Sequence, residues 1–204
     1  LEDTKARTTQ FRRVWAGASY SDPDRLALLA LGAVLSRDRV GPLSKALIYD
    51  RPLATQVYAT NIDMERSGVF QIVVIPRPNA SLTAIEQVMD SVLADVRTRG
   101  VTAQDLNPYK KSNAVLAITS LQSRESRADT LAHDEVFAHD PVAYAKQVDE
   151  TSKLTPADIA RVTRKYLTSG GVVMSLVPAG KLELIAKPEL PYKNVTPALT
   201  KVTP

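Results

Sequence analysis

The sequence predicts an α+β fold in which helices cover one face of an antiparallel sheet. Strand-like runs occur near the start, in the middle and near the end of the chain. A long amphipathic segment follows the middle pair of runs, and further helical segments separate that pair from the last strand. This order is that of a two-layer split arrangement, β-α-β-β-α(n)-β.

Composition limits the class of protein. The chain has 204 residues, of which 44% are hydrophobic, so it can bury one sizeable core. Its 26 basic and 22 acidic residues are interspersed, which is typical of a solvated surface and does not favour nucleic-acid binding. There is no cysteine, which excludes disulfides, thiol nucleophiles and cysteine metal sites. No apolar run approaches the roughly 20 residues of a membrane span.

The elements up to Pro76 alternate between strand and helix. A short run with Phe11, Val14 and Trp15 ends at Gly17 and predicts a strand. Residues 21–24 combine capping side chains with an early proline, so a largely buried helix should follow. Two later strand-like runs, joined by the seven residues NIDMERS, predict an antiparallel hairpin with a long loop. The segments are QFRRVWAG (strand), RLALLALGAVLS and KALIYD (helix), and LATQVYAT and GVFQIVVIP (strands).

Helical periodicity begins after Ala84. Thr83 and Glu86 are placed as a capping box, and Gly100 is placed as the stop. The apolar residues between them recur at the three- and four-residue spacing of one helix face. They are Ile85, Val88, Met89, Val92, Leu93 and Val96.

The start of the next helix has two candidate caps. Thr102 with Asp105 is one, but Pro108 would then remove a backbone hydrogen bond inside the helix. Asn107 as the cap, with Pro108 at the first helical position, is the other. Further helices are expected in NAVLAITSLQSRES, ADTLAHDEVFA, PVAYAKQVDE and LTPADIARVTRKYL, the last capped by Thr155, and GGVVMSLVP should close the fold as a buried strand.

We expect one domain over residues 1–182. Residues 183–204 are rich in proline and have no periodicity, so they are interpreted as a linker or as a strap toward a following domain. The chain opens on Leu1 and not on Met, which suggests a piece of a longer protein from which a signal peptide would be lost to view.

No self-contained active site can be found. His133 and His139 are the only histidines, and six residues on a helix separate two side chains by about 240° around the axis. The chain has no His-Glu-x-x-His, no His-x-x-Glu-His, no nucleophile elbow and no glycine-rich phosphate loop. We therefore expect no catalytic residue, no metal ligand and no cofactor in this chain.

The order of several segments resembles a known family. Leu43 to Val57 reads LSKALIYDRPLATQV and follows the strand-like FRRVWAG, and ADTLAHDEVFAHDP, LTPADIARVTRKYL and VVMSLVPAGK come later. Over residues 2–181 this pattern resembles the non-zinc, or second, domain of insulinase and pitrilysin family zinc metallopeptidases, which have a mitochondrial-processing-peptidase-like fold. The resemblance implies that zinc and its His-x-x-Glu-His motif belong to the first domain of a parent enzyme.

The resemblance also assigns two positions that have lost their functional residues. A domain of this fold in the half opposite the zinc contributes an Arg and a later Tyr, flanked by leucines, that grip the substrate. Matching Leu47 and Leu53 places Ile48 at the Arg position and Thr55 at the Tyr position. Ile48 and Thr55 are therefore expected to face the substrate chamber without contributing to catalysis.

Arg51 and Tyr58 have the same spacing as the missing pair, displaced by three residues. An alignment that uses Arg51 and Tyr58 moves Leu47 and Leu53 away from the leucine positions of the family pattern. A shift by three residues also turns the Tyr58 side chain to the face of the strand opposite Thr55, unless a β-bulge changes its direction. The competing expectation is that Arg51 is exposed at a turn and that Tyr58 packs in the sheet. Both residues are kept as the alternative substrate contacts.

The functional hypothesis is a non-catalytic domain that walls the peptide chamber of a zinc metallopeptidase and supports its zinc domain. The partners implied are other domains or a homologous subunit of the peptidase, with a peptide substrate in the assembled enzyme. The alternative is a non-catalytic subunit or structural homologue that acts through protein contacts. An RNA-binding module ranks last, because the strands lack paired exposed aromatics. We expect a bacterial protein, in the periplasm rather than the cytoplasm.

Overall fold

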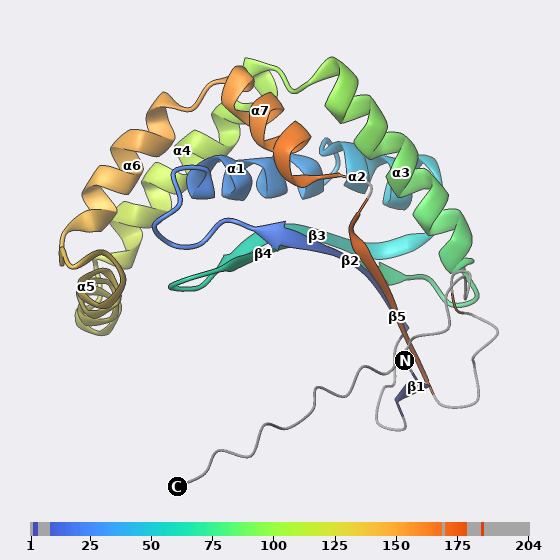
Figure 1. Cartoon of the computed structure of the whole chain (residues 1–204), viewed down its shortest axis with the longest axis horizontal. Helices are drawn as coiled ribbons and strands as arrows, with labels where there is room; N and C mark the ends of the chain where they lie inside the picture. Colours follow the sequence, from blue (N-terminus) through green and yellow to red (C-terminus); the bar gives the residue numbers. More distant parts are fainter. Residues whose placement is uncertain (1, 4–8, 169, 179–184, 186–204) are drawn as a thin grey trace, which may run out of the picture.

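The computed structural model describes residues 2–3, 9–168, 170–178 and 185. Four strands form an antiparallel sheet in the order β5-β2-β4-β3, and a short β1 lies parallel to β5 at one edge. Helices cover one face of this sheet (Figure 1), which confirms the predicted two-layer α+β fold. The strands are β1 (Glu2–Asp3), β2 (Gln10–Gly17), β3 (Ala54–Asp63), β4 (Gly68–Pro76) and β5 (Val172–Pro178).

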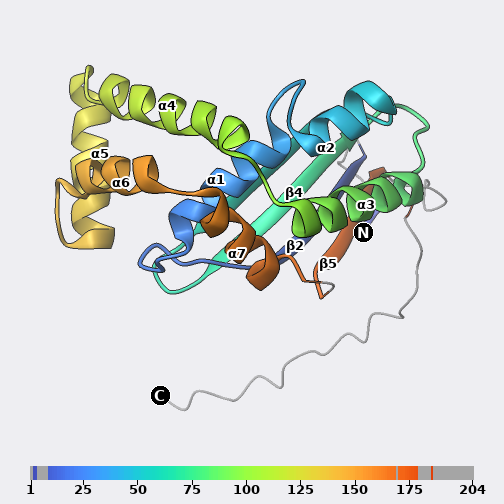
Figure 2. The same ribbon diagram turned by 90° about the horizontal axis from the view of Figure 1, so that it is seen from above.

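The helices form two groups. α1, α3 and α7 lie over the sheet and, with it, make up what we call the sheet body, whereas α4, α5 and α6 extend beyond the sheet as a helical arm (Figures 1 and 2). The bounds are α1 (Arg25–Ser36), α2 (Pro42–Ser44), a π-helical η1 (Lys45–Asp50), α3 (Leu82–Arg99), α4 (Ala103–Ser120), α5 (Arg124–Ala138), α6 (Ala143–Lys153) and α7 (Pro156–Tyr166).

The core lies between the sheet and its helices. α1 approaches β3 so closely that a Cβ on Gly32 would lie 2.5 Å from the carbonyl oxygen of Ala59, so only glycine fits there. The amide of Asn61, also on β3, accepts from the backbone nitrogen of Ala18 at 3.1 Å and donates to its oxygen at 2.9 Å. This buried amide fixes the end of β2 against β3, since a buried amide left unpaired would be costly.

Two predicted caps need correction. The N-cap of α3 is Ser81, whose hydroxyl accepts from the Ala84 backbone at 3.2 Å, and not Thr83. α4 starts with the Thr102 capping box, so the alternative start at Asn107 is wrong and Pro108 lies inside the helix. The Thr155 cap of α7 and the stop of α3 at Gly100 are confirmed. Within α3, Val92 is only half-buried, so Met89 and Leu93 are the centre of the apolar stripe.

Two features of the sheet also differ from expectation. The hairpin loop is shorter than the seven residues predicted, because β3 extends to Asp63 and β4 starts at Gly68. β5 is buried only in its second half, at Ser175 and Val177, and its first residue Val172 is 64% exposed. The proline-rich segment 183–204 lies outside the described residues except for Ile185, which packs against the hydrophobic core.

α7 is attached to the start of α1 through the buried carboxyl of Asp24. Lys165 and Tyr166 donate to its Oδ2 at 2.6 and 3.1 Å, and Arg161 donates to its Oδ1. Burial alone would raise the pKa of Asp24, but these hydrogen bonds outweigh it and hold the pKa below its ordinary value. Asp24 is therefore ionised at neutral pH and joins two helices that are far apart in the sequence.

Candidate functional surface

The helix-to-strand element predicted from Leu43 to Val57 is present and anchored. Leu47 in η1 is fully buried, and its carbonyl accepts from the backbone nitrogen of Leu53 at 3.0 Å. Leu53 is half-buried, and its own carbonyl accepts from the nitrogen of Arg77 at 2.8 Å. The two leucines thus hold the turn at Pro52 between the core and the end of β4.

The four candidate residues lie along this element with different exposure. Ile48 is half-buried and packs against the core, whereas Thr55 is exposed and donates to the carbonyl of Ile75 at 3.2 Å. Arg51 is exposed at the turn, as expected. Tyr58 is 52% exposed, so the expectation that it packs in the sheet is wrong.

A β-bulge at Thr55 explains the exposure of Tyr58. Ala54 pairs with Pro76 but Gln56 pairs with Ile75, so Thr55 is an extra residue in β3. Burial then alternates from the bulge onward, which leaves both Thr55 and Tyr58 exposed. The hydroxyl of Tyr58 donates to the side chain of Gln56 at 2.8 Å. In a regular strand without a bulge, the side chains of Thr55 and Tyr58 would lie on opposite faces of the sheet.

The side-chain chemistry of the described residues does not fit a metal. No group of three or more His, Asp or Glu within these residues could hold a metal ion. The ring of His133 packs edge-to-face against that of Tyr20, with centroids 5.4 Å apart, and His139 ends α5 in a left-handed conformation. The chain's own sequence offers no zinc motif.

The face of the sheet that the helices leave uncovered carries both apolar and polar side chains. Arg12 on β2 is paired with Met174 on β5 and with Val73 on β4, and Val73 is paired with Tyr58 on β3. A second row in the same registers joins Val172, Val14, Gln71 and Thr60. Ile62 lies four residues after Tyr58 on β3, so its side chain points to the same face of the sheet, and it is 45% exposed. We call this surface the open sheet face.

The open sheet face was missed by the sequence analysis although the sequence carried a signal for it. β4 reads GVFQIVVIP and β5 reads VVMSLVP, both nearly continuous apolar runs. Such runs are typical of strands that are buried on both faces, whereas a half-covered antiparallel strand alternates between apolar and polar residues. The described helices cover only one face, and Val172 and Met174 are exposed on the other.

A polar network positions the helical arm. Asp134 on α5 is almost fully buried; it accepts from the hydroxyl of Tyr20 at 3.2 Å and from the backbone nitrogen of Tyr144 at 2.6 Å. Gln147 on α6 donates to the Tyr20 hydroxyl at 2.8 Å and accepts from Arg25 at 3.1 Å. Burial and the nearby carboxylate of Asp134 raise the pKa of Tyr20, so its hydroxyl stays protonated.

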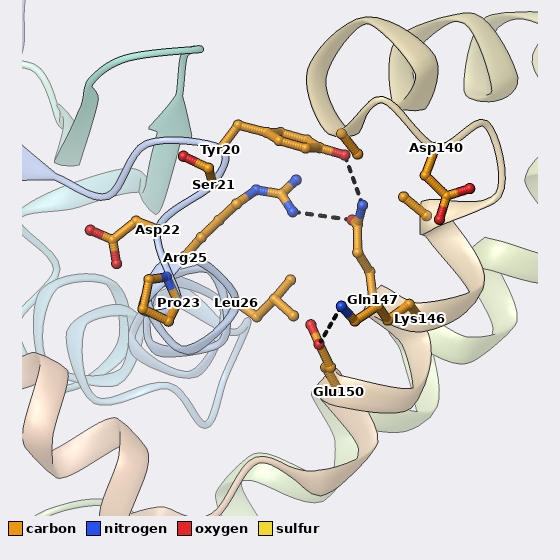
Figure 3. Close-up of a pocket in the computed structure, with 12 residues that line it drawn as sticks. Tyr20, Ser21, Asp22, Pro23, Arg25, Leu26, Asp140, Lys146, Gln147 and Glu150 are labelled. Carbon is orange, nitrogen blue, oxygen red and sulfur yellow. Dashed lines mark hydrogen bonds and ion pairs between the residues drawn. The ribbon is translucent and has the colours of Figure 1, made fainter.

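Figure 3 shows the side chains of Tyr20, Arg25 and Gln147 meeting at a pocket between the start of α1 and α6. The pocket has a volume of about 320 Å³, and its lining mixes the aromatic ring of Tyr20 with Asp22, Asp140 and the Lys146–Glu150 pair. Both acidic and basic side chains line it, Arg25 among the latter.

The comparisons with known proteins identify the family. The model of the peptidase M16 inactive domain matches residues 2–113, more than half of the chain. The chain belongs to the peptidase M16 inactive-domain family. The resemblance to the non-zinc domain of insulinase and pitrilysin peptidases is thereby confirmed, and the chain is a non-catalytic domain of the zinc-protease type.

Three relatives illustrate the match. The zinc protease PqqE of Helicobacter pylori is 23% identical over 157 residues, which are 74% of this chain and 35% of that protein. A crystal structure described as an inactive peptidase domain from Bordetella parapertussis has a TM-score of 0.75 at 16% identity, covering 87% of this chain and 96% of that one. The periplasmic protease PqqL from Escherichia coli has a TM-score of 0.68 at 17% identity, covering 87% and 20%.

The relatives differ in length from this chain. It spans about a third of PqqE and a fifth of PqqL, but nearly the whole of the Bordetella domain. The described residues contain no helix with the length and apolar character of a membrane span. The fold is therefore that of one domain type found both within longer bacterial proteases and in a crystallised domain of similar size.

Proposed function

We propose that this domain walls the peptide chamber of a bacterial zinc metallopeptidase and supports its zinc domain through the open sheet face. The observation that carries the proposal is the row Met174–Arg12–Val73–Tyr58, which runs across four strands on a face without helices. Exposed apolar side chains such as Met174 and Val172 on this face are of the kind that is normally covered in an assembled protein. Residues 1–182 would form the domain, and zinc would belong to another domain of the parent.

The length of the relatives supports the choice of partner. Because this chain matches only 35% of PqqE, a parent of that kind has ample further chain to cover the open sheet face. The zinc domain of the same parent is the covering element we propose. A separate homologous subunit is the alternative, and a His-x-x-Glu-His upstream in the same reading frame would decide between them.

Charge substitutions on the open sheet face test the proposal. Val172 is 64% exposed, so Val172→Asp should leave the stability of the isolated chain within about 0.5 kcal/mol. In the full-length parent the same change would bury an unpaired carboxylate, which should lower peptidase activity at least tenfold and lower the midpoint of thermal unfolding.

Val142→Asp is the matched control. Val142 is 53% exposed and lies at the start of α6 in the helical arm, away from the sheet. The Val142→Asp change should leave the peptidase activity of the parent within about twofold of wild type, because substitutions of exposed residues outside an interface are nearly neutral. Full activity of the Val172→Asp parent would show that the zinc domain does not use this face.

Ile48 and Thr55 are proposed to face the chamber at positions without gripping side chains. Ile48→Ala and Thr55→Ala should leave turnover in the parent within about threefold, because no transition-state contact is lost. Arg51→Ala, at an exposed turn outside the open sheet face, tests the alternative pair in the same assay. A hundredfold loss from the Thr55 change, with folding intact, would mean that this element still binds substrate.

We propose that the parent lies in the periplasm, and the similarity to the periplasmic protease PqqL from Escherichia coli supports this location. Osmotic-shock fractionation of the source bacterium, with an antibody against this domain, tests the location. Recovery with a cytoplasmic marker enzyme would contradict it.

A further inference from the structure

Arg12 is the only charged residue among the described strand positions of the open sheet face on β2, β3, β4 and β5. Each other position in these registers holds an apolar side chain, an amide or a hydroxyl. Arg12 lies on β2, the middle strand of the sheet, between Met174 of β5 and Val73 of β4. A single positive charge therefore stands among neutral side chains near the middle of this face.

Two glutamine side chains are the partners of Arg12 within the described residues. Its Nε and Nη2 donate to Oε1 of Gln10 at 3.4 and 3.2 Å, and its Nη1 donates to Oε1 of Gln71 at 3.5 Å. A guanidinium has five N–H groups, so these contacts leave one N–H on each terminal nitrogen without a described acceptor. Both glutamines are neutral, so they supply hydrogen bonds but no opposite charge.

The next residue along β2 shows how this chain accommodates a buried arginine. Arg13 lies on the face that the helices cover and is 9% exposed, and its Nη1 donates to the carboxylate of Asp90 on α3. Arg12 is half-buried on the other face, and no described carboxylate forms an ion pair with it. A guanidinium stays protonated in a protein, so covering Arg12 without an opposite charge would be strongly unfavourable.

The surroundings of Arg12 favour a broad contact with another part of the protein. Its row runs from Met174 to Tyr58 across four strands, a width of about 14 Å. Met174 and Tyr58, at the two ends of the row, are 38% and 52% exposed. An extended peptide along one or two strands would leave most of this width in water, whereas a segment of a neighbouring domain can cover it.

We propose that the segment covering the open sheet face is apolar and carries one Asp or Glu, whose carboxylate accepts from Nη1 and Nη2 of Arg12. This inference rests on the proposed function, in which the zinc domain of the parent covers this face. A carboxylate matches the two terminal nitrogens of a guanidinium in a bidentate arrangement, which also fixes the orientation of the segment. Apolar side chains on either side of the acid contact Met174 and Tyr58. A strongly acidic segment does not fit, because a single cation would leave the other carboxylates unpaired.

Replacement of Arg12 in the full-length parent tests the charge of the covering segment. Arg12→Met removes the charge, so the facing carboxylate is left buried without a partner. The midpoint of thermal unfolding of the parent should fall by at least about 5 °C at about pH 7. In the isolated 204-residue chain, where the face is open, the same change should move the midpoint by less than about 2 °C. Arg12→Lys keeps the charge without the bidentate contact, and should lose less than half as much.

Arg124→Met is the matched control. Arg124 is exposed at the start of α5 in the helical arm, away from the sheet (Figure 1). This change should leave the midpoint of the parent within about 2 °C of wild type. A loss as large as that of Arg12→Met would show that the effect is not specific to the open sheet face, and would overturn the inference.

The pH dependence distinguishes a carboxylate from an uncharged acceptor. In the Arg12→Met parent the facing carboxyl is buried without a counter-charge, which raises its folded pKa above the roughly 3.9 to 4.3 of free Asp and Glu. Protonation then removes the unpaired charge, so the difference in midpoint between wild type and variant should shrink below about pH 5. Apart from Arg12, Tyr58 is the only ionisable side chain at the described strand positions of this face.

Each remaining outcome contradicts a named part of the argument. A loss that does not shrink at low pH would assign the contacts of Arg12 to uncharged acceptors, and an equal loss in the isolated chain would assign them to this domain alone. An unchanged midpoint with a raised KM for acidic peptides would assign Arg12 to the substrate. If Val172→Asp impairs the parent and Arg12→Met does not, this inference fails and the proposed function stands. If neither change affects the parent, both fail.

Discussion

The sheet body and the helical arm are built on different balances of forces. α1 has 12 residues, of which seven are buried and none of those is charged. α4 has 18 residues, yet Leu106 is its only buried one, and the only buried residue of α5 is the charged Asp134. The body is therefore held by removal of apolar surface from water, and the arm by a few specific hydrogen bonds.

This difference indicates which part of the molecule can change its conformation at a small cost in free energy. Segments with few buried apolar contacts open locally at lower free energy than the core. The arm also exposes Val115, Leu116 and Ile118 on α4, each about 60% or more accessible. The helical arm is therefore the part of the molecule that should open at the lower free energy.

Removing a core side chain from the sheet body should have the largest effect. Leu31 on α1 is fully buried, so Leu31→Ala should lower the free energy of unfolding by about 2 to 5 kcal/mol. The matched arm variant is Leu116→Ala, whose side chain is 63% exposed and whose loss should cost less than about 0.5 kcal/mol. Urea denaturation of both proteins measures the contrast, and equal losses would erase the distinction between body and arm.

Removing the carboxyl that fixes the arm should come second. Asp134→Ala leaves the Tyr20 hydroxyl and the Tyr144 backbone nitrogen without their acceptor, a loss of about 2 to 3 kcal/mol. Hydrogen exchange should accelerate in α5 and α6 and remain slow in β2 and β4. Asp129→Ala, at an exposed position of the same helix, is the control and should change neither region. Faster exchange in the sheet as well would mean that arm and body unfold together.

The junction of α1 with α7 should show a smaller, pH-dependent effect. Asp24→Asn removes the carboxylate that Lys165 and Arg161 share, and should cost about 1 to 2 kcal/mol at pH 7. The folded pKa of Asp24 lies below its ordinary value of 3.8, so its contribution is complete above that value and is lost as the pH falls through the folded pKa. Urea midpoints should therefore differ between wild type and variant from about pH 5 to pH 7, and the difference should shrink as the pH falls below 3.8 toward the lowered folded pKa. A difference that does not shrink at all below pH 3.8 would assign the cost to packing and not to charge.

The smallest effect is expected on the exposed side of α4. Val115→Ser and Ile118→Ser each replace an exposed apolar side chain, and each should change the stability of the isolated chain by less than about 0.5 kcal/mol. Thermal melts of the single variants check this. A loss above about 1 kcal/mol from either one would show that the arm packs more tightly than its exposure indicates.

Local patterns predicted much of the fold. The apolar stripe from Ile85 to Val96 predicted α3, and Thr155 with Pro156 predicted the start of α7. Both predictions succeeded because helical periodicity and capping depend only on residues within one or two helical turns. The cap of α3 was misplaced at Thr83 since two capping side chains stand two residues apart, and Leu82 joins the helix because it is buried there. The candidate site was predicted less well, since the exposure of Tyr58 depends on one extra residue.

The sequence by itself determined the α+β order and the leucine anchors around Pro52, both of which follow from residue types and short spacings. Tertiary structure alone decided the rest. The bulge at Thr55 exists only in the pairing of β3 with β4, and the contact of Asp134 with Tyr20 joins residues 114 positions apart. Such contacts depend on where whole elements pack, and burial and hydrogen bonding across the fold set that arrangement.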